Sequence, residues 1–212
     1  LVGAVPRVGG ERGIARDPKD GDVARAPALP VPTRQADAVR RALRAVETDA
    51  DAAIATWISI ASVPAPSGRE GERARVVARI LRQHGFEATV LADGNVEAIW
   101  PGEPGPPAVV SAHLDALNQE PFVAPRRQGD LLIGPGTLDD ASGLAAMIHA
   151  ASALREAGWR PRRELRLLAT VGEEVGLLGA KSYLSGPTKP AAFVAIDGIL
   201  GKVDYGATGI RW

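Results

Sequence analysis

The sequence contains no cysteine. This absence excludes disulfide bonds and thiolate metal sites, so any bound metal must take its ligands from His, Asp and Glu side chains. Neither sign of charge dominates, because Lys plus Arg and Asp plus Glu number 25 each. That balance does not suggest a basic face for nucleic acid. No apolar run approaches the ~20 residues of a membrane-spanning helix. We therefore expect neither nucleic acid nor a membrane as a partner.

The first 33 residues differ from the rest of the sequence. They are rich in glycine and proline, carry scattered charges, and show no apolar periodicity. We predict a flexible leader over 1–33 and a folded region over 34–212. The leader lacks the apolar core of a signal peptide, and its acidic residues disfavour a transit peptide. A cytoplasmic location is therefore expected, with secretion as the alternative because the sequence starts at Leu1 rather than Met.

The folded region alternates helical and extended patterns. Apolar residues recur at helical spacing from Ala36 onwards, and an alanine-rich helix is expected over 140–157. The predicted strands are 86–91, 95–100, 107–112, 164–171 and 192–197. This order is typical of an α/β domain. With 45% hydrophobic residues but only 4% aromatic ones, the core must consist mainly of Val, Leu, Ile and Ala.

Local signals indicate where some of these elements begin and end. Ser67 and Glu70 have the S-x-x-E spacing of a capping box, in which both side chains bond backbone N–H groups at a helix start. Gly85 suits the end of that helix, because glycine readily adopts a left-handed conformation. Residues 93–95 (DGN) are typical of the turn between the first two strands.

Acidic residues and one histidine follow the predicted strands. They are His113, Asp115, Asp139, Asp140, Glu173, Glu174 and Asp197. Active sites of open α/β sheets gather at the carboxyl ends of strands, so these side chains should lie near one another. Asp115 follows His113 by two positions, which puts both on the same side of an extended segment.

Taken singly, these residues have ordinary explanations. One aspartate of the 139–140 pair could be a helix N-cap, and the 173–174 pair a solvated strand end. Together, the carboxylates would repel one another and raise their own pKa values unless a cation lay among them. We therefore predict a site for two divalent metal ions. A carboxylate at Asp115 would hold the far nitrogen of His113 and fix its tautomer.

Four stretches of the sequence carry a family resemblance. They are SAHLDAL (111–117), GDLLIGPGTLDDASGLAAM (129–147), LLATVGEEVGLLGAKSYL (167–184) and FVAIDG (193–198). The sequence resembles the co-catalytic zinc hydrolases that include carboxypeptidase G, aminoacylase, carnosinase, acetylornithine deacetylase and succinyl-diaminopimelate desuccinylase. The resemblance implies a three-layer α/β/α zinc-peptidase-like catalytic domain with a mostly parallel mixed sheet.

The resemblance also implies metal ligands. His113 and Asp197 would bind one zinc ion. Glu174 would bind the second, and Asp139 would bridge the two. The peptide bond between Asp139 and Asp140 would be cis, as is frequent in the family. Co²⁺ or Mn²⁺ would suit the same ligands, because affinity order alone does not decide which metal a protein holds in a cell.

The implied reaction is hydrolysis of an amide bond in a small peptide or an N-acyl amino acid. Glu173 would act as general base and then general acid, and Asp115 would support His113. A water between the two metal ions would be the nucleophile. The predicted activity is therefore that of a metallopeptidase of the carboxypeptidase or deacylase kind.

The sequence departs from the family pattern at 139–143. It reads DDASG where DDKG is common, and EEVGLLGAK follows at 173–181. This form also resembles zinc aminopeptidases of the bacterial leucyl aminopeptidase type, which are the alternative. SVPAPSG (62–68) and IDG (196–198) favour the carboxypeptidase-like group.

A second departure concerns a further metal-binding histidine. The family has it near the C-terminus, after an inserted lid and dimerisation domain. The sequence stops at Trp212, about where that insertion would begin. We therefore expect an N-terminal portion of a longer enzyme, weakly active or inactive alone, with any homodimer formed through the lid. A fragment that serves only in binding or structure is the alternative from another functional class.

Overall fold

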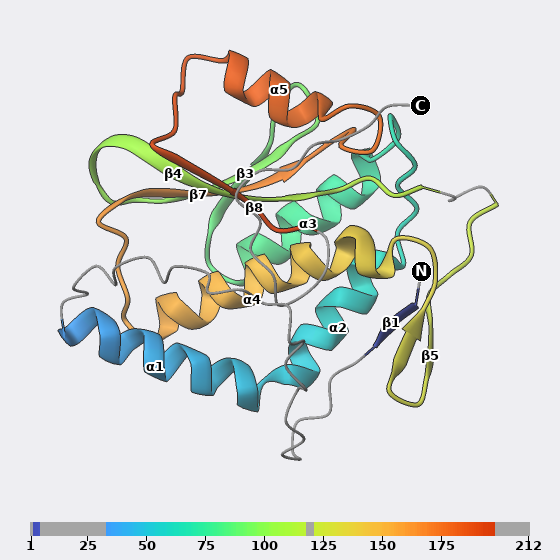
Figure 1. Ribbon diagram of the computed structural model, residues 1–212, viewed down its shortest axis with the longest axis horizontal. Helices are drawn as coiled ribbons and strands as arrows, with labels where there is room; N and C mark the ends of the chain where they lie inside the picture. Colours follow the sequence, from blue (N-terminus) through green and yellow to red (C-terminus); the bar gives the residue numbers. More distant parts are fainter. Residues whose placement is uncertain (1, 5–32, 118–120, 198–212) are drawn as a thin grey trace, which may run out of the picture.

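The computed structural model describes residues 2–4, 33–117 and 121–197, and its centre is a five-stranded sheet (Figure 1). In sheet order the strands are β2 (Glu87–Val90), β3 (Val96–Trp100), β7 (Arg163–Thr170), β4 (Glu103–His113) and β8 (Ala192–Ala195). β2 and β3 pair antiparallel, as do β3 and β7, whereas β4 is parallel to both β7 and β8. The predicted mixed α/β sheet is therefore confirmed.

Helices cover both faces of this sheet and complete three layers (Figure 1). On one face lie α1 (Thr33–Thr48), α2 (Ala50–Ala61), α3 (Gly71–Gln83) and α4 (Gly143–Glu156). The opposite face carries α5 (Leu178–Ser185). The helical stretch expected from Ala36 is thus two helices, divided at Asp49. None of the helices in the described part of the chain is both long and apolar enough to cross a bilayer.

Consecutive apolar residues in β7 explain why the sheet is covered on both faces. Leu167 and Leu168 point to opposite faces, and both are buried. Leu167 joins the large core under α2, α3 and α4. Leu168 packs with Val109 of β4 and Tyr183 of α5 in a smaller second core. The strand could not be solvated on either face, so the three-layer arrangement follows from its sequence.

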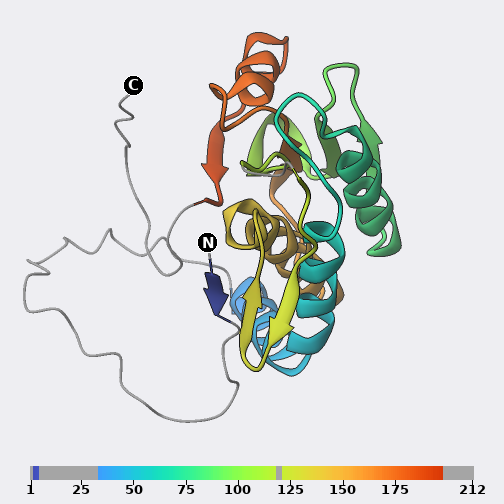
Figure 2. The same ribbon diagram turned by 90° about the vertical axis from the view of Figure 1, so that its right-hand side faces the viewer.

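Three short strands lie apart from the central sheet. β5 (Arg126–Gln128) and β6 (Leu131–Ile133) form an antiparallel hairpin, and β1 (Val2–Ala4) adds to it through β6. Figure 2 shows β1 alongside the hairpin. Leu1, residues 5–32 and those after 197 lie outside the described residues. The division into a leader over 1–33 and a folded region over 34–212 therefore stays a prediction.

Two of the local turn signals are confirmed. Gly85 follows α3 with φ of +78°, and Gly94 has φ of +91° in the turn between β2 and β3. In that turn the Asp93 carboxylate accepts a hydrogen bond from the backbone N–H of Asn95 at 3.1 Å. Positive φ at both glycines explains why these positions stop regular structure.

The predicted capping box is wrong. α3 begins after Glu70 without any side-chain cap bond. The Ser67 hydroxyl donates instead to Asp115, and Glu70 accepts from the backbone N–H groups of Gly68 and Gly172. Leaving a buried polar group without a hydrogen bond costs more free energy than leaving a helix N–H group exposed to water. Ser67 and Glu70 therefore bond the buried groups rather than the start of α3.

The packing of the core predicts that alanine substitution of two leucines in the helical layer has very different effects on stability. Leu81 of α3 is 0% exposed and Leu43 of α1 is 60% exposed. Leu81→Ala should lower the free energy of unfolding by about 2–5 kcal/mol, because it leaves a cavity in the core. The matched control Leu43→Ala should change it by less than about 0.5 kcal/mol. Urea denaturation of both variants measures the difference, and equal effects would contradict the packing described here.

Candidate metal centre

The parallel strands bring the predicted site residues to one edge of the sheet. Because β4 runs parallel to β7 and β8, the carboxyl ends of all three meet there. The segment η1 (Thr137–Ser142), which leads into α4, approaches the same edge through contacts with β4. All six predicted site residues come together; they are His113, Asp115, Asp139, Glu173, Glu174 and Asp197.

Two groups of three residues could each hold a metal ion. One consists of His113, Asp139 and Glu174, and the other of His113, Glu173 and Asp197. Within each group the potential ligand atoms lie within 4.8 Å of one another. His113 thus lies near Asp197, and Asp139 near Glu174, as expected. Glu173, expected to be a base and not a ligand, lies in the second group. One imidazole with several carboxylates is a donor set that zinc accepts.

His113 presents one ring nitrogen to the site and turns the other inward. Its Nδ1 lies 3.0 Å from the backbone oxygen of Asp115 and 3.4 Å from that residue's carboxylate. Its Nε2 lies 2.8 Å from Asp139 and 4.0 Å from Glu173. Burial alone would lower the pKa of His113, but hydrogen bonds with Asp115 and Asp139 outweigh it and raise the pKa to about 11.

The carboxylate of Asp115 supports the loop after β7 as well as the histidine. It is fully buried and accepts hydrogen bonds from the backbone N–H groups of Glu173, at 2.9 Å, and Glu174, at 3.2 Å. The Ser67 hydroxyl donates to it at 2.7 Å. Burial alone would raise the pKa of Asp115, but hydrogen bonds from His113, Ser67 and the backbone lower it to about 2. Asp115 was predicted to support His113, and in the structure it also supports the loop that carries Glu173 and Glu174.

Asp139 and Asp140 are neighbours with different surroundings. Asp140 is 2% exposed and accepts from the backbone N–H groups of His113, at 2.9 Å, and Gly143, at 3.0 Å. Burial raises the pKa of Asp140 to about 8. The Asp139 side chain is 38% exposed and faces His113. The peptide bond between the two aspartates is cis, as the resemblance implied. The aspartate at the helix start is therefore Asp140, and Asp139 faces the site.

The two glutamates show the electrostatic conflict expected of crowded carboxylates. Burial raises the pKa of Glu173, and the charges of Asp197, Asp115 and Asp139 raise it further against the opposing effect of His113. The pKa of Glu174 is raised in the same way, by burial first and then by Asp139. A cation among these groups would remove the conflict, so the arrangement fits the predicted metal.

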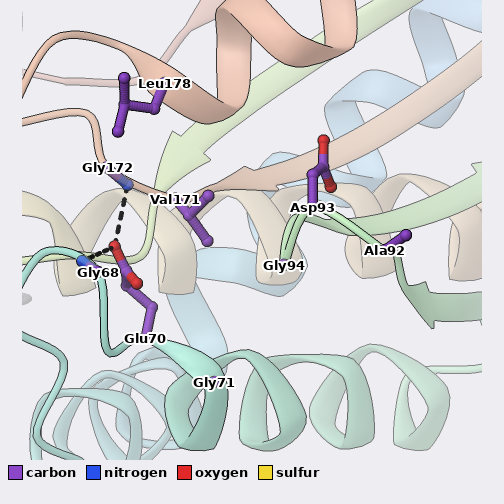
Figure 3. Close-up of a pocket in the computed structure, with 9 residues that line it drawn as sticks. All are labelled: Gly68, Glu70, Gly71, Ala92, Asp93, Gly94, Val171, Gly172 and Leu178. Atoms are coloured by element: carbon purple, nitrogen blue, oxygen red, sulfur yellow. Dashed lines mark hydrogen bonds between the residues drawn. The ribbon is translucent and has the colours of Figure 1, made fainter.

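A pocket of about 350 Å³ adjoins this edge but is separate from the candidate ligands (Figure 3). It lies between the start of α3, the turn from β2 to β3 and the end of β7. Its lining residues are Gly68, Glu70, Gly71, Ala92, Asp93, Gly94, Val171, Gly172 and Leu178. None of these residues is a candidate metal ligand, although Gly172 directly precedes Glu173.

One supporting residue escaped the sequence analysis. Arg73 of α3 is fully buried and donates to the backbone oxygens of Val63, at 2.6 and 3.0 Å, and Leu114, at 2.8 Å. Burial lowers its pKa to about 10, although Asp115 and Glu70 oppose that shift. Helical spacing could have indicated this, because position 73 shares a face with the buried Val77.

A three-layer α/β/α fold with one histidine and several carboxylates at the strand ends defines a domain of the zinc-peptidase class. The comparison with family models agrees. The model for Peptidase family M28 matches residues 95–202, half of the chain, and the chain belongs to this family.

Individual relatives match over part of their length. Leupeptin-inactivating enzyme 1 of Streptomyces exfoliatus is 32% identical over 128 residues, covering 56% of this chain and 26% of that protein. Carboxypeptidase G2 of Pseudomonas sp. (strain RS-16) is 27% identical over 123 residues, covering 54% and 30%. The human carnosine dipeptidase 1 structure shares the fold, with a TM-score of 0.64 at 14% identity over 76% of this chain and 41% of that one.

These comparisons confirm the predicted resemblance to the zinc peptidases. Each matched segment spans about a quarter to a third of the two curated relatives' own length. The preference for the carboxypeptidase-like group over the aminopeptidase type stays a prediction, as do the roles of individual site residues.

The surroundings of Asp139 and Asp140 predict that alanine variants of the two residues lose different amounts of stability. Asp140→Ala would leave the backbone N–H groups of His113 and Gly143 without their acceptor. It should lower the free energy of unfolding of the metal-free chain by about 2 kcal/mol or more. Asp139→Ala should cost less, because the Asp139 side chain is far more exposed. Urea denaturation in the presence of a chelator measures both, and a larger loss in Asp139→Ala would contradict the assignment.

Proposed function

We propose that this domain is the metal-binding part of a hydrolase that cuts amide bonds in small peptides or N-acyl amino acids. The convergence of His113 with four carboxylates at one sheet edge carries the proposal. The like charges of such a set repel one another unless a cation lies among them, and the set offers the nitrogen and oxygen ligands that zinc takes in hydrolytic sites. The names of the relatives, a carboxypeptidase and a dipeptidase among them, support the substrate class.

In this proposal His113 and Asp197 would hold one zinc ion, Glu174 would hold a second, and Asp139 would serve both. Metal held there would supply polarisation of a carbonyl oxygen and a more nucleophilic water. The remaining tasks belong to side chains that the fold positions.

Glu173 is the proposed general base and acid. Its side chain is partly buried, and its carboxylate lies 4.0 Å from His113 Nε2, at the edge of the ligand cluster. Asp115 accepts a hydrogen bond from the backbone N–H of Glu173, which fixes the position of the Glu173 main chain. From there the Glu173 carboxylate would take a proton from water and return it to the leaving nitrogen. His113 is oriented in turn by its Nδ1 contact with the Asp115 carbonyl.

The aminopeptidase type is the second candidate. The DDASG form at 139–143 favours it. The two candidates differ in the substrate group that the site must accept, a free amine in the aminopeptidase and an acylated nitrogen in the carboxypeptidase or deacylase. Metal stoichiometry distinguishes both from a fragment that serves only in binding or structure, because two tightly held ions favour an enzyme and one or none favours the fragment.

Metal content is the first test. After purification and dialysis, elemental analysis should find zinc in the chain, two ions per molecule if residues 1–212 supply every ligand and one if the further histidine is needed. Asp139→Ala should retain less zinc, because it removes a carboxylate proposed to serve both ions. Asp51→Ala, which alters an exposed aspartate of α2, is the control and should retain as much zinc as wild type. A wild-type chain that retains no zinc, or an Asp139→Ala chain that retains as much as wild type, would contradict the proposal.

If Glu173 is the general base, a substitution there should reduce turnover without reducing metal binding. Glu173→Gln should keep zinc and reduce hydrolysis by about 10²–10⁴-fold, because it removes the proton acceptor. Assays use dipeptides with a free amine and N-acyl amino acids, and the preferred set distinguishes the two candidate functions. Glu72→Gln, at an exposed position of α3, is the matched control. Loss of zinc from Glu173→Gln would instead assign Glu173 as a ligand.

A further inference from the structure

Glu70 is a buried carboxylate outside the set of candidate ligands. It is 5% exposed and precedes the first residue of α3. One of its oxygens accepts hydrogen bonds from the backbone N–H groups of Gly68, at 2.9 Å, and Gly172, at 3.0 Å, as Figure 3 shows. Gly172 is the residue directly before Glu173. Glu70 therefore connects the start of a helix to the loop that carries both candidate glutamates.

Two buried carboxylates together hold three successive N–H groups of that loop. Glu70 accepts from Gly172, and Asp115 accepts from Glu173 and Glu174. The Ser67 hydroxyl, which donates to Asp115, belongs to the same turn as Glu70. The turn over 67–70 thus contacts the loop directly at Gly172 and, through Asp115, at Glu173 and Glu174.

The loop has little freedom on its other side. Gly172 has φ of +59°, and a Cβ built there would lie 3.0–3.2 Å from the side chain of Leu178. Gly172 is therefore confined between the Glu70 carboxylate and Leu178 (Figure 3). A shift of the Glu70 oxygen would be passed to the backbone of Gly172 and from there to Glu173.

The charge of Glu70 is balanced inside the protein. Arg73 lies one helical turn further along α3, fully buried, and the negative charges of Asp115 and Glu70 both stabilise its guanidinium. The guanidinium is itself held by the backbone oxygens of Val63 and Leu114. A buried ion with a counter-charge and hydrogen bonds is tolerated, so this arrangement can keep Glu70 in its acceptor role.

We propose that Glu70 is a positioning residue, which through the N–H of Gly172 sets the place of Glu173 and Glu174 relative to His113 and Asp139. The proposal rests on the function proposed above, because it concerns the same metal centre. A positioning role for Glu70 differs from a merely structural role, because replacing Glu70 should then change metal binding even in a variant that is folded.

The test is zinc affinity, measured by competition with a chromophoric chelator on the full 212-residue chain. Glu70→Ala should weaken zinc binding by about 10–100-fold, the usual effect of losing a residue that orients ligands. Glu70→Gln keeps an oxygen acceptor of the same reach and should recover most of that loss. Glu72→Ala, which changes an exposed glutamate of the same helix, should bind zinc as wild type does.

Two further measurements keep the outcome decisive. Circular dichroism with a chelator present identifies the temperature at which every variant is folded, and affinities are compared there. If Glu70→Ala does not fold, Glu70→Asp replaces it, because the shorter side chain keeps the charge but cannot reach both N–H groups. The visible spectrum of the Co²⁺-loaded chain should also shift in Glu70→Ala and not in Glu72→Ala.

The possible failures are distinguishable. A folded Glu70→Ala or Glu70→Asp chain with wild-type zinc affinity and an unchanged Co²⁺ spectrum would overturn the positioning role alone. A wild-type chain that binds neither zinc nor Co²⁺ would overturn the proposed function, and the positioning role with it.

Discussion

The parallel pairing of β4 with β7 and β8 is the constraint on which the candidate site depends. Parallel strands end at the same edge, and their register makes the ends nearly level, with His113 opposite Thr170 and Ser111 opposite Ala195. Side chains that follow these strands therefore meet at that edge, where Asp115 also links the loop after β4 to the loop after β7. Parallel pairing in turn needs crossover connections, and the chain supplies α4 between β4 and β7 and α5 between β7 and β8.

Carboxylates gather at this edge in two layers with different physical roles. The inner layer accepts hydrogen bonds from backbone N–H groups and consists of Glu70, Asp115 and Asp140. Buried carboxylates are tolerated there because each has donors, and Arg73 adds a buried positive charge close to two of them. The outer layer consists of Asp139, Glu173, Glu174 and Asp197, grouped around His113. Burial and the neighbouring carboxylates raise the pKa of both glutamates in the outer layer, and a cation among these groups would oppose that shift.

The sequence predicted the parts of this arrangement that depend on residue type and order. The central strands, the two turn glycines and the convergence of the six site residues could be predicted because apolar runs, glycine and acidic strand ends are local signals. The hairpin of β5 and β6 was missed because its strands are only three residues long, and the short helix α5 was given no bounds. The capping box failed for another reason. Ser67 and Glu70 have the right spacing, but partners from distant parts of the chain compete for them.

The two acidic pairs show most clearly what only the fold decides. In the 139–140 pair one residue faces the site and its neighbour holds the backbone of His113. In the 173–174 pair both side chains belong to the candidate ligand groups, and their backbone N–H groups are held by Asp115 instead. Identical neighbours in a sequence carry no signal that separates these cases. The difference arises because the buried carboxylate belongs to the pair itself in one case, as Asp140, and to another segment in the other, as Asp115. In both cases a carboxylate of the inner layer bonds main-chain N–H groups, of His113 and Gly143 or of Glu173 and Glu174. The inner layer therefore positions the backbone of residues whose side chains face the site.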